Sequence, residues 1–398
     1  MTIPKLVTTF AVVLASTCFA QRFDMTKIAP ATLYTSERGY GYEAASDKPP
    51  YFFSVRVPEE GNYRVTVKFG HPKLATTTTV KAELRRLMLE KVETAPGKYV
   101  TRTFVVNVRR PQIAGGGDEV RLKQREKESE AWAWDDKLTL EFTNAKPGVT
   151  AIEIERAKVP TLYIAGDSTS TDQPVEPYNS WGQMLTRFFK PTVAVANHGE
   201  SGESLRGFVG EQRLAKLMTV MKPGDWLFIQ MGHNDQKERG EGIGAFTSYK
   251  ADLKKFIAAA RERGTTPVLV TSMHRISWGP DGTIANSLGD YPEAARQTAK
   301  EENVALIDLH AMSKTLYEAI GQANLPKAFA DNDKTHHNNY GSYQLAKCIV
   351  EGIRTAKLPL EKHLTDEAPR FDPSRPDPVE SFVIPAEPRG ALVKPYGN

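Results

Sequence analysis

Ser168 has the sequence setting of a catalytic nucleophile. Residues 161–165 are mostly apolar and run directly into Gly-Asp-Ser-Thr at 166–169. An uninterrupted apolar run of this length predicts a strand buried on both faces of a parallel sheet. The glycine and aspartate end that strand, so Ser168 should lie at its carboxyl end, where open α/β sheets bind ligands. Taken alone, a Ser/Thr-rich turn that caps the next helix explains the stretch equally well.

Asp333 and His336 can supply the other two members of a serine-hydrolase triad. They lie three positions apart in the sequence Asp-Asn-Asp-Lys-Thr-His-His at 331–337. A serine nucleophile needs a base, and the base needs an anion that fixes its tautomer. One loop can therefore present both side chains to Ser168, and a solvated polar loop is the alternative. A metal site at His336 and His337 is a poor interpretation because adjacent side chains point apart.

Gly202 and Asn234 follow two further predicted strands and can complete an ester-cleaving site. Such a site must hold the developing oxyanion with preorganised hydrogen-bond donors. The N–H groups of Ser168 and Gly202 and the side-chain amide of Asn234 offer three donors, and glycine lets the backbone approach without a Cβ atom. Taken singly, an ordinary turn residue remains the better interpretation of Gly202 and of Asn234.

The second half of the chain alternates strands and helices, which predicts how these residues are positioned. Besides 161–165, strands are predicted at 193–196, 226–231, 267–271 and 304–308. Helices are predicted between and after them, at 181–189, 214–221, 249–263, 291–302, 312–321 and 341–354. Strict alternation predicts a parallel sheet covered by helices on both faces, a flavodoxin-like three-layer α/β/α fold.

The N-terminal third predicts a β-sandwich. Short runs with turn signals between them and no helical period lie at 51–57, 63–69, 99–108, 138–142 and 149–154. Residues 84–89 fit a strand or a helix, and the charged run at 121–130 predicts a solvated loop. Trp132 and Trp134 can stack on sugar, although a core position is favoured. Every predicted catalytic residue follows the linker at 159–160, so the sequence gives no reason to expect the sandwich to help build the active site.

The two ends of the chain predict segments outside these folds. Residues 1–20 have a basic residue, an apolar stretch and a small-residue cleavage site, which predicts a secretory signal peptide. The proline-rich residues 358–398 predict an extension that lies on the surface or is disordered. The expected organisation is therefore a signal peptide at 1–20, a β-sandwich at 21–158, a catalytic domain at 159–357 and the extension. Removal of the signal leaves Cys348 as the remaining cysteine, without an intrachain disulfide.

Four motifs together resemble the SGNH (GDSL) hydrolases. The Gly-Asp-Ser-Thr block, Gly202, the Gly-His-Asn-Asp block at 232–235 and the Asp-x-x-His pair occur in that superfamily's order. Segments typical of its rhamnogalacturonan acetylesterase branch, secreted enzymes that deacetylate pectin, follow the same order, at 197–204, 289–292, 306–310, 331–337 and 339–341. The resemblance implies Ser168 as nucleophile, His336 as acid–base oriented by Asp333, and an oxyanion hole of Ser168, Gly202 and Asn234. The sequence departs from the branch at Glu203, where arginine is common.

We therefore expect a secreted or periplasmic carbohydrate O-acetylesterase that acts on an acetylated polysaccharide, most simply pectin, without cofactor or metal. The formal net charge of +4 comes from scattered basic residues, which indicates no nucleic-acid partner, and no membrane span or protein partner is implied. Arg206 and Arg275 should lie on the catalytic edge, where each can bind a galacturonate carboxylate or pair with a protein carboxylate such as Glu203 or Asp290. The alternatives are an esterase for xylan, another glycan or a lipid, and a carbohydrate-binding protein on an inactive hydrolase fold.

Overall fold

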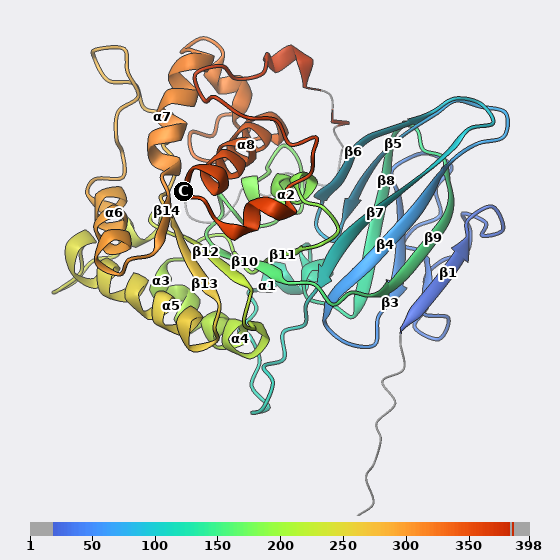
Figure 1. The fold of residues 1–398 in the computed structure, drawn as a ribbon, viewed down its shortest axis with the longest axis horizontal. Helices are drawn as coiled ribbons and strands as arrows, with labels where there is room; N and C mark the ends of the chain where they lie inside the picture. The colour runs from blue at the N-terminus through green and yellow to red at the C-terminus, as the bar shows by residue number, and fades with distance from the viewer. Residues whose placement is uncertain (1–18, 383, 386–398) are drawn as a thin grey trace, which may run out of the picture.

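The computed structural model describes residues 19–382 and 384–385 of the 398-residue chain. An antiparallel β region, which we call the sandwich, is formed by residues 20–156, and an α/β part is formed by residues 161–355 (Figure 1). Residues 1–18 of the predicted signal peptide lie outside the described residues, and the first strand begins at Ala20.

The sandwich consists of two antiparallel sheets, as the alternating runs predict. One sheet has the strand order β1 (Ala20–Asp24), β9 (Val149–Arg156), β4 (Gly61–Gly70) and β7 (Tyr99–Val108). The other has the order β2 (Tyr40–Tyr42), β3 (Tyr51–Arg56), β8 (Lys137–Lys146), β5 (Thr76–Ala82) and β6 (Arg86–Thr94). In β4 the fully buried Val65 and Val67 alternate with Thr66 and Lys68, which point away from the core. This period of two places one apolar face of each sheet in a shared core.

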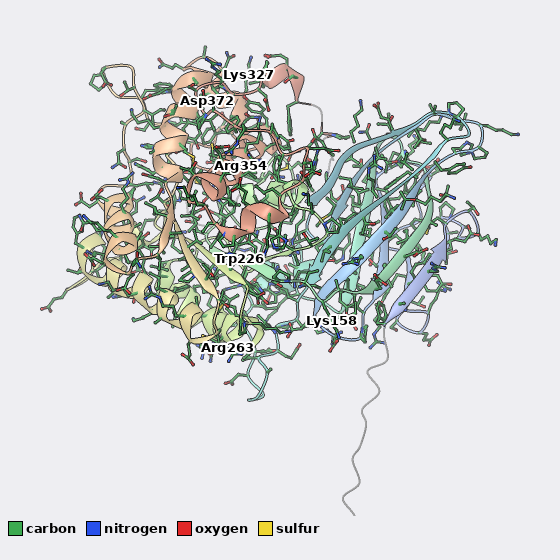
Figure 2. The ribbon with its side chains drawn as sticks, in the orientation of Figure 1. Lys158, Trp226, Arg263, Lys327, Arg354 and Asp372 are labelled. Carbon is green, nitrogen blue, oxygen red and sulfur yellow. The ribbon has the colours of Figure 1, made fainter. Side chains whose placement is uncertain are left out.

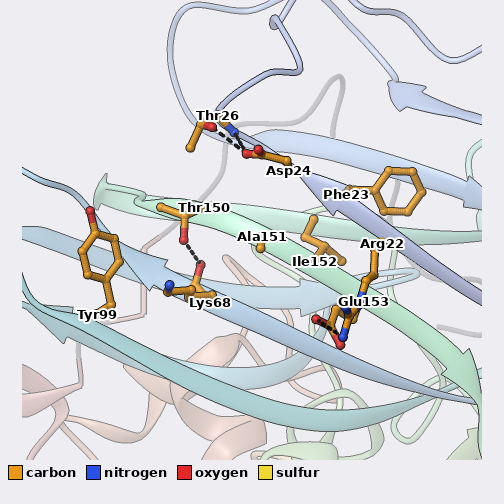
Figure 3. Close-up of a pocket in the computed structure, with 10 residues that line it drawn as sticks. All are labelled: Arg22, Phe23, Asp24, Thr26, Lys68, Tyr99, Thr150, Ala151, Ile152 and Glu153. Atoms are coloured by element: carbon orange, nitrogen blue, oxygen red, sulfur yellow. Dashed lines mark hydrogen bonds and ion pairs between the residues drawn. The ribbon is translucent and has the colours of Figure 1, made fainter.

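The outer face of the first sheet is polar. Figure 3 shows a shallow depression on it, lined by residues of β1, β4, β7 and β9. There the guanidinium of Arg22 lies 3.0 Å from the carboxylate of Glu153, and the amine of Lys68 lies 4.9 Å from the centre of the Tyr99 ring. These charged side chains already have partners on the sheet surface.

The α/β part has the predicted three-layer architecture. All strand pairs of its sheet are parallel, in the order β11 (Ala194–Asn197), β10 (Thr161–Gly166), β12 (Trp226–Gln230), β13 (Thr266–Val270) and β14 (Ala305–Ile307). Leu162 and Ile164 face one core, which is covered by α2 (Trp181–Leu185), α7 (Leu309–Ile320) and α8 (Asn339–Thr355). Tyr163 and Ala165 face the other, which is covered by α3 (Leu205–Gly210), α4 (Arg213–Val220), α5 (Lys250–Glu262) and α6 (Tyr291–Glu301).

Side-chain caps explain where several helices begin. The Ser180 hydroxyl accepts from the N–H of Gln183 and starts α2, as predicted. The Asp308 carboxylate accepts from the N–H of Ala311, so α7 starts at Leu309. The prediction of a helix from 312 therefore began three residues too late.

The prediction of a solvated loop at 121–130 was wrong. Its centre forms the short helix α1 (Gln124–Lys127), and Glu126 is buried. The Glu126 carboxylate lies 2.5 Å from the guanidinium of Arg213 in α4 and accepts a hydrogen bond of 2.8 Å from the indole of Trp134. The charged run therefore joins the sandwich to the α/β part, and Trp134 has the core position that was favoured for it.

The described part of the C-terminal segment is anchored on the α/β part. Phe371 and Ile384 are buried in the core beside α8, and the Arg354 guanidinium donates to the carbonyls of Ala368 and Pro369. Figure 2 marks Arg354 in α8 and Asp372 in this segment. Cys348 is buried within α8 and has a free thiol. Among the described residues, no helix is long and apolar enough to cross a membrane.

Candidate active site

The structure brings Ser168, His336 and Asp333 together at the carboxyl edge of the parallel sheet. Ser168 lies two residues after β10, and the loop that carries Asp333 and His336 directly precedes α8. His336 Nε2 lies 2.7 Å from Ser168 Oγ, and His336 Nδ1 lies 2.9 Å from Asp333 Oδ2. All three side chains are buried. The three residues therefore form one continuous hydrogen-bonded chain.

The surroundings of Asp333 keep its carboxyl group ionised. Burial alone would raise its pKa, but hydrogen bonds from the His336 ring and from the N–H groups of His336 and Thr335 hold the pKa well below its ordinary value. An ionised carboxylate can only accept hydrogen bonds, so the proton of His336 belongs on Nδ1. The Nε2 lone pair then faces the Ser168 hydroxyl and can accept its proton.

His337 points away from this chain. Its Nε2 lies 2.6 Å from the Tyr317 hydroxyl, and its ring packs on Phe329 with ring centres 4.2 Å apart. Burial lowers the pKa of His337 to about 3, so the ring is neutral at physiological pH. His337 therefore has a packing position within the protein rather than a place beside Ser168.

The turn that carries Ser168 is held by polar contacts that the sequence did not reveal. The Asp167 carboxylate accepts from the backbone N–H and the hydroxyl of Thr169, and its other oxygen lies 3.3 Å from His233 Nδ1. The Gln173 side-chain amide donates to the carbonyl of Ser168 at 2.7 Å. His233 belongs to the Gly-His-Asn-Asp block, so a motif marked its position without indicating its partner. No pattern marked Gln173.

Gly202 and Asn234 lie together at the ends of β11 and β12. Gly202 has a φ of 82°, a left-handed conformation that favours glycine. The Asn234 side-chain amide donates one N–H to the carbonyl of Glu203 at 2.9 Å, and its second N–H makes no hydrogen bond to the part of the chain that the structure describes. The Glu203 carboxylate itself is buried against Lys123, and burial raises its pKa to about 7.

The two candidate arginines have different surroundings. Arg206 Nε lies 2.9 Å from Asp252 Oδ2 and 3.8 Å from Glu238 Oε2, so its partners are neither Glu203 nor Asp290. Arg275 donates to the hydroxyl of Thr335 at 3.1 Å and to the carbonyl of His233 at 3.3 Å, both beside the triad.

Arg275 is the less neutralised of the two candidate arginines. Among the described residues, no carboxylate oxygen lies within ion-pair distance of its guanidinium. Burial lowers the pKa of Arg275, and the charges of Asp167 and Asp333 partly offset that effect. Arg275 is therefore a partly buried cation at the edge of the site, whereas Arg206 is already neutralised by protein carboxylates.

Comparison with known proteins decides the family of this chain. Residues 164–343 match the sequence model of the GDSL-like lipase/acylhydrolase family. The chain is 39% identical over 220 residues to the rhamnogalacturonan acetylesterase RhgT of Bacillus subtilis, a match that covers 51% of this chain and 93% of that protein. The chain belongs to the GDSL-like lipase/acylhydrolase family. The resemblance to its rhamnogalacturonan acetylesterase branch is confirmed, and the protein is a serine ester hydrolase of this family.

Two further similarities support the family and the fold. The probable rhamnogalacturonan acetylesterase YesY of the same organism is 38% identical over 218 residues, which cover 52% of this chain and 98% of that protein. The crystal structure of the B. subtilis protein YXIM has a TM-score of 0.50 at 22% sequence identity and covers 83% of this chain and 94% of that one. The fold similarity therefore extends well beyond the residues that match the family model.

Proposed function

We propose that this family member is a carbohydrate O-acetylesterase that removes acetyl groups from rhamnogalacturonan in pectin. The hydrogen-bonded chain from Ser168 through His336 to Asp333 supports the chemistry. The names of the relatives RhgT and YesY, each nearly 40% identical, support the substrate. An intact set of catalytic residue types argues against a binding protein on an inactive hydrolase fold.

The proposed reaction uses Ser168 as a covalent nucleophile. Ser168 Oγ attacks the acetyl carbonyl carbon while His336 Nε2 takes the hydroxyl proton, and the ionised Asp333 stabilises the resulting imidazolium. The tetrahedral intermediate expels the sugar oxygen, which takes that proton from His336. A water molecule then attacks the acetyl-enzyme, again losing its proton to His336 Nε2. Collapse of this second intermediate breaks the ester bond, returns the proton to Ser168 Oγ and releases acetate.

The proposed oxyanion hole consists of the N–H groups of Ser168 and Gly202 and the side-chain amide of Asn234. The left-handed φ of Gly202 supports this assignment, as does the second N–H of Asn234, which has no acceptor among the described residues. Donors fixed before the reaction stabilise the developing oxyanion without reorganising in the transition state. The hydrogen bond from Asn234 to the carbonyl of Glu203 helps to fix its amide in that way.

We propose Arg275 rather than Arg206 as the residue that binds a galacturonate carboxylate. Arg206 is neutralised by Asp252, whereas Arg275 lies between His233 and Thr335 beside the triad. A guanidinium suits a planar carboxylate because it can donate two parallel hydrogen bonds. We therefore assign charge recognition to Arg275 within this proposal.

We infer that residues 1–20 direct secretion to the outside of the cell or the periplasm, in keeping with a polymeric substrate. We also retain the division into a sandwich at 21–158, a catalytic domain at 159–357 and a C-terminal extension at 358–398. An esterase for acetylated xylan or another ester is the alternative activity.

A comparison of acetylated polymers tests the proposed function. The purified protein is incubated with acetylated rhamnogalacturonan, acetylated xylan and a short-chain triacylglycerol, and released acid is measured. We expect acetate to be released fastest from rhamnogalacturonan. Faster release from xylan would contradict the pectin assignment and leave the esterase chemistry intact, and no release from any substrate would contradict both.

A further inference from the structure

A turn of the sandwich reaches into the active-site region of the α/β part. Residues 83–85 connect β5 to β6, and Arg85 within this turn has a φ of 59°. Strand β6 packs beside α2 (Figure 1). The Gln183 side chain in α2 donates to the carbonyl of Leu84 at 2.7 Å. The Arg85 side chain is 1% exposed, so the turn carries a buried cation into the second part of the protein.

The Arg85 guanidinium is bound by four groups of the α/β part. Its Nη1 donates to the backbone carbonyls of Gln173 at 3.1 Å and Tyr178 at 2.9 Å. Its Nη2 lies 3.0 Å from the Glu176 carboxylate and 3.3 Å from the side-chain oxygen of Asn339, the first residue of α8. One planar side chain thus joins the segment at 173–178 to the start of α8.

The segment bound by Arg85 contacts both reacting residues. Gln173 donates through its side chain to the carbonyl of Ser168. The ring of Tyr178 meets the ring of His336 edge-on, with ring centres 6.0 Å apart. Arg85 therefore fixes the backbone of one residue that holds the nucleophile turn and of another that packs against the base.

Arg86, the next residue, makes a similar contact with the α/β part. Arg86 Nε donates to Asp172 Oδ2 at 2.6 Å, and both side chains are 1% exposed. The other oxygen of Asp172 accepts from the Asn197 amide at 2.8 Å. Asn197 is the last residue of β11, so this pair connects the sandwich to the two loops that carry Ser168 and Gly202.

We propose that Arg85 is a positioning residue for the Ser168–His336 pair, supplied to the active site by the N-terminal sandwich. This inference rests on the proposed function, because it assigns Arg85 to the alignment of that catalytic pair. Arginine suits the role because its rigid fork donates in several fixed directions, whereas lysine offers a single ammonium on a flexible stem. A displacement of about 1 Å in the reacting groups can lower a rate by about 100-fold.

The test compares three arginine variants of the full chain. Arg85→Met removes the donors at similar length, and Arg85→Lys keeps the charge without the fork. Arg22→Met is the matched control, because Arg22 is also a sandwich arginine paired with a carboxylate, but it lies on the outer face shown in Figure 3. For each variant, kcat and KM on p-nitrophenyl acetate are measured. The rate and the final extent of serine labelling by an organophosphonate are also measured.

We expect Arg85→Met to lower kcat and the labelling rate by about 100-fold, with KM changed less than about 3-fold and complete final labelling. Arg85→Lys should lower kcat and the labelling rate by about 10-fold, and Arg22→Met should match the wild type in both quantities. Complete labelling at a reduced rate indicates misaligned groups in a folded protein, whereas incomplete labelling at the wild-type rate indicates partial unfolding and would overturn the inference.

Two further outcomes separate this inference from the proposed function. If Arg85→Met does not fold, Arg85→Lys carries the test, and a wild-type labelling rate in that variant overturns the positioning role. A wild-type protein that hydrolyses no ester and takes up no label overturns the proposed function itself, together with the inference that rests on it. If the wild type is active and the Arg85 variants are equally active, only the inference is overturned.

Discussion

Replacing each of the two adjacent histidines with alanine should produce two different defects, a loss of activity in one variant and a loss of stability in the other. His336 bridges Ser168 and Asp333 through its two ring nitrogens, whereas His337 contacts Tyr317 and Phe329. Both rings are buried, so their exposed fractions do not distinguish the two histidines. The structure therefore predicts that His336→Ala removes activity and that His337→Ala removes stability.

The expected magnitudes follow from these contacts. His336→Ala removes the proposed proton acceptor and should lower kcat by at least about 10³-fold, equivalent to about 4 kcal/mol of transition-state stabilisation. His337→Ala leaves the buried Tyr317 hydroxyl without its partner and opens a cavity beside Phe329, which together should cost about 2–4 kcal/mol. At about 2 °C per kcal/mol for a chain of this size, Tm should fall by about 4–8 °C.

Both effects can be measured on the same purified proteins. Hydrolysis of p-nitrophenyl acetate at 25 °C gives kcat, and circular dichroism gives Tm and shows that each variant is folded at the assay temperature. We expect His337→Ala to retain kcat within about 5-fold of the wild type. An inactive His337→Ala protein that is folded, or a His336→Ala protein with near wild-type kcat, would refute the assignment of the base.

Two further predictions concern charge. Arg275→Ala should lower kcat/KM on acetylated pectin by about 10-fold and leave kcat/KM on a neutral acetyl ester unchanged. Arg206→Ala should affect kcat/KM on the two substrates equally. If Arg275→Ala lowers kcat/KM equally on both substrates, Arg275 has a structural role instead. Burial, and the negative charge of Glu200 beside it, raise the pKa of Glu130 to about 9. The stability that its protonated form contributes is full below its unfolded pKa of about 4 and is lost as the pH rises toward 9. Glu130→Gln replaces the carboxyl group with a neutral amide that does not titrate, so the Tm of this variant relative to the wild type should increase between pH 5 and pH 9. A constant difference in Tm across this pH range would contradict this prediction.

The parallel sheet could be predicted because its sequence signals are local. An apolar run such as 161–165 is buried on both faces and ends at a glycine, and the structure places β10 at Thr161–Gly166. The same signals placed the loops with Ser168, Gly202 and Asn234 at one edge of the sheet, because parallel strands all end there. A motif of two residues in one loop was enough to pair Asp333 with His336, although only the structure gives the distances.

The contribution of the sandwich could not be predicted because it depends on contacts between distant segments. Arg85 lies 88 residues before Gln173 and 254 before Asn339, and no periodicity or spacing links them. Residues 84–89 were ambiguous because the turn and the start of β6 fall within one short run. The charged residues near Glu126 were mistaken for a solvated loop for the same reason, since their partner Arg213 is 87 residues away.

Acetate release by the wild type and by Ser168→Ala tests the central claim most directly. Both proteins are incubated with acetylated rhamnogalacturonan, and circular dichroism confirms that the variant is folded. The Ser168 hydroxyl is the attacking group in the proposed reaction and lies 2.7 Å from its base. We predict that Ser168→Ala releases acetate at least about 10³-fold more slowly than the wild type. Release at a rate close to that of the wild type by the folded variant would contradict the assignment of Ser168 as the nucleophile.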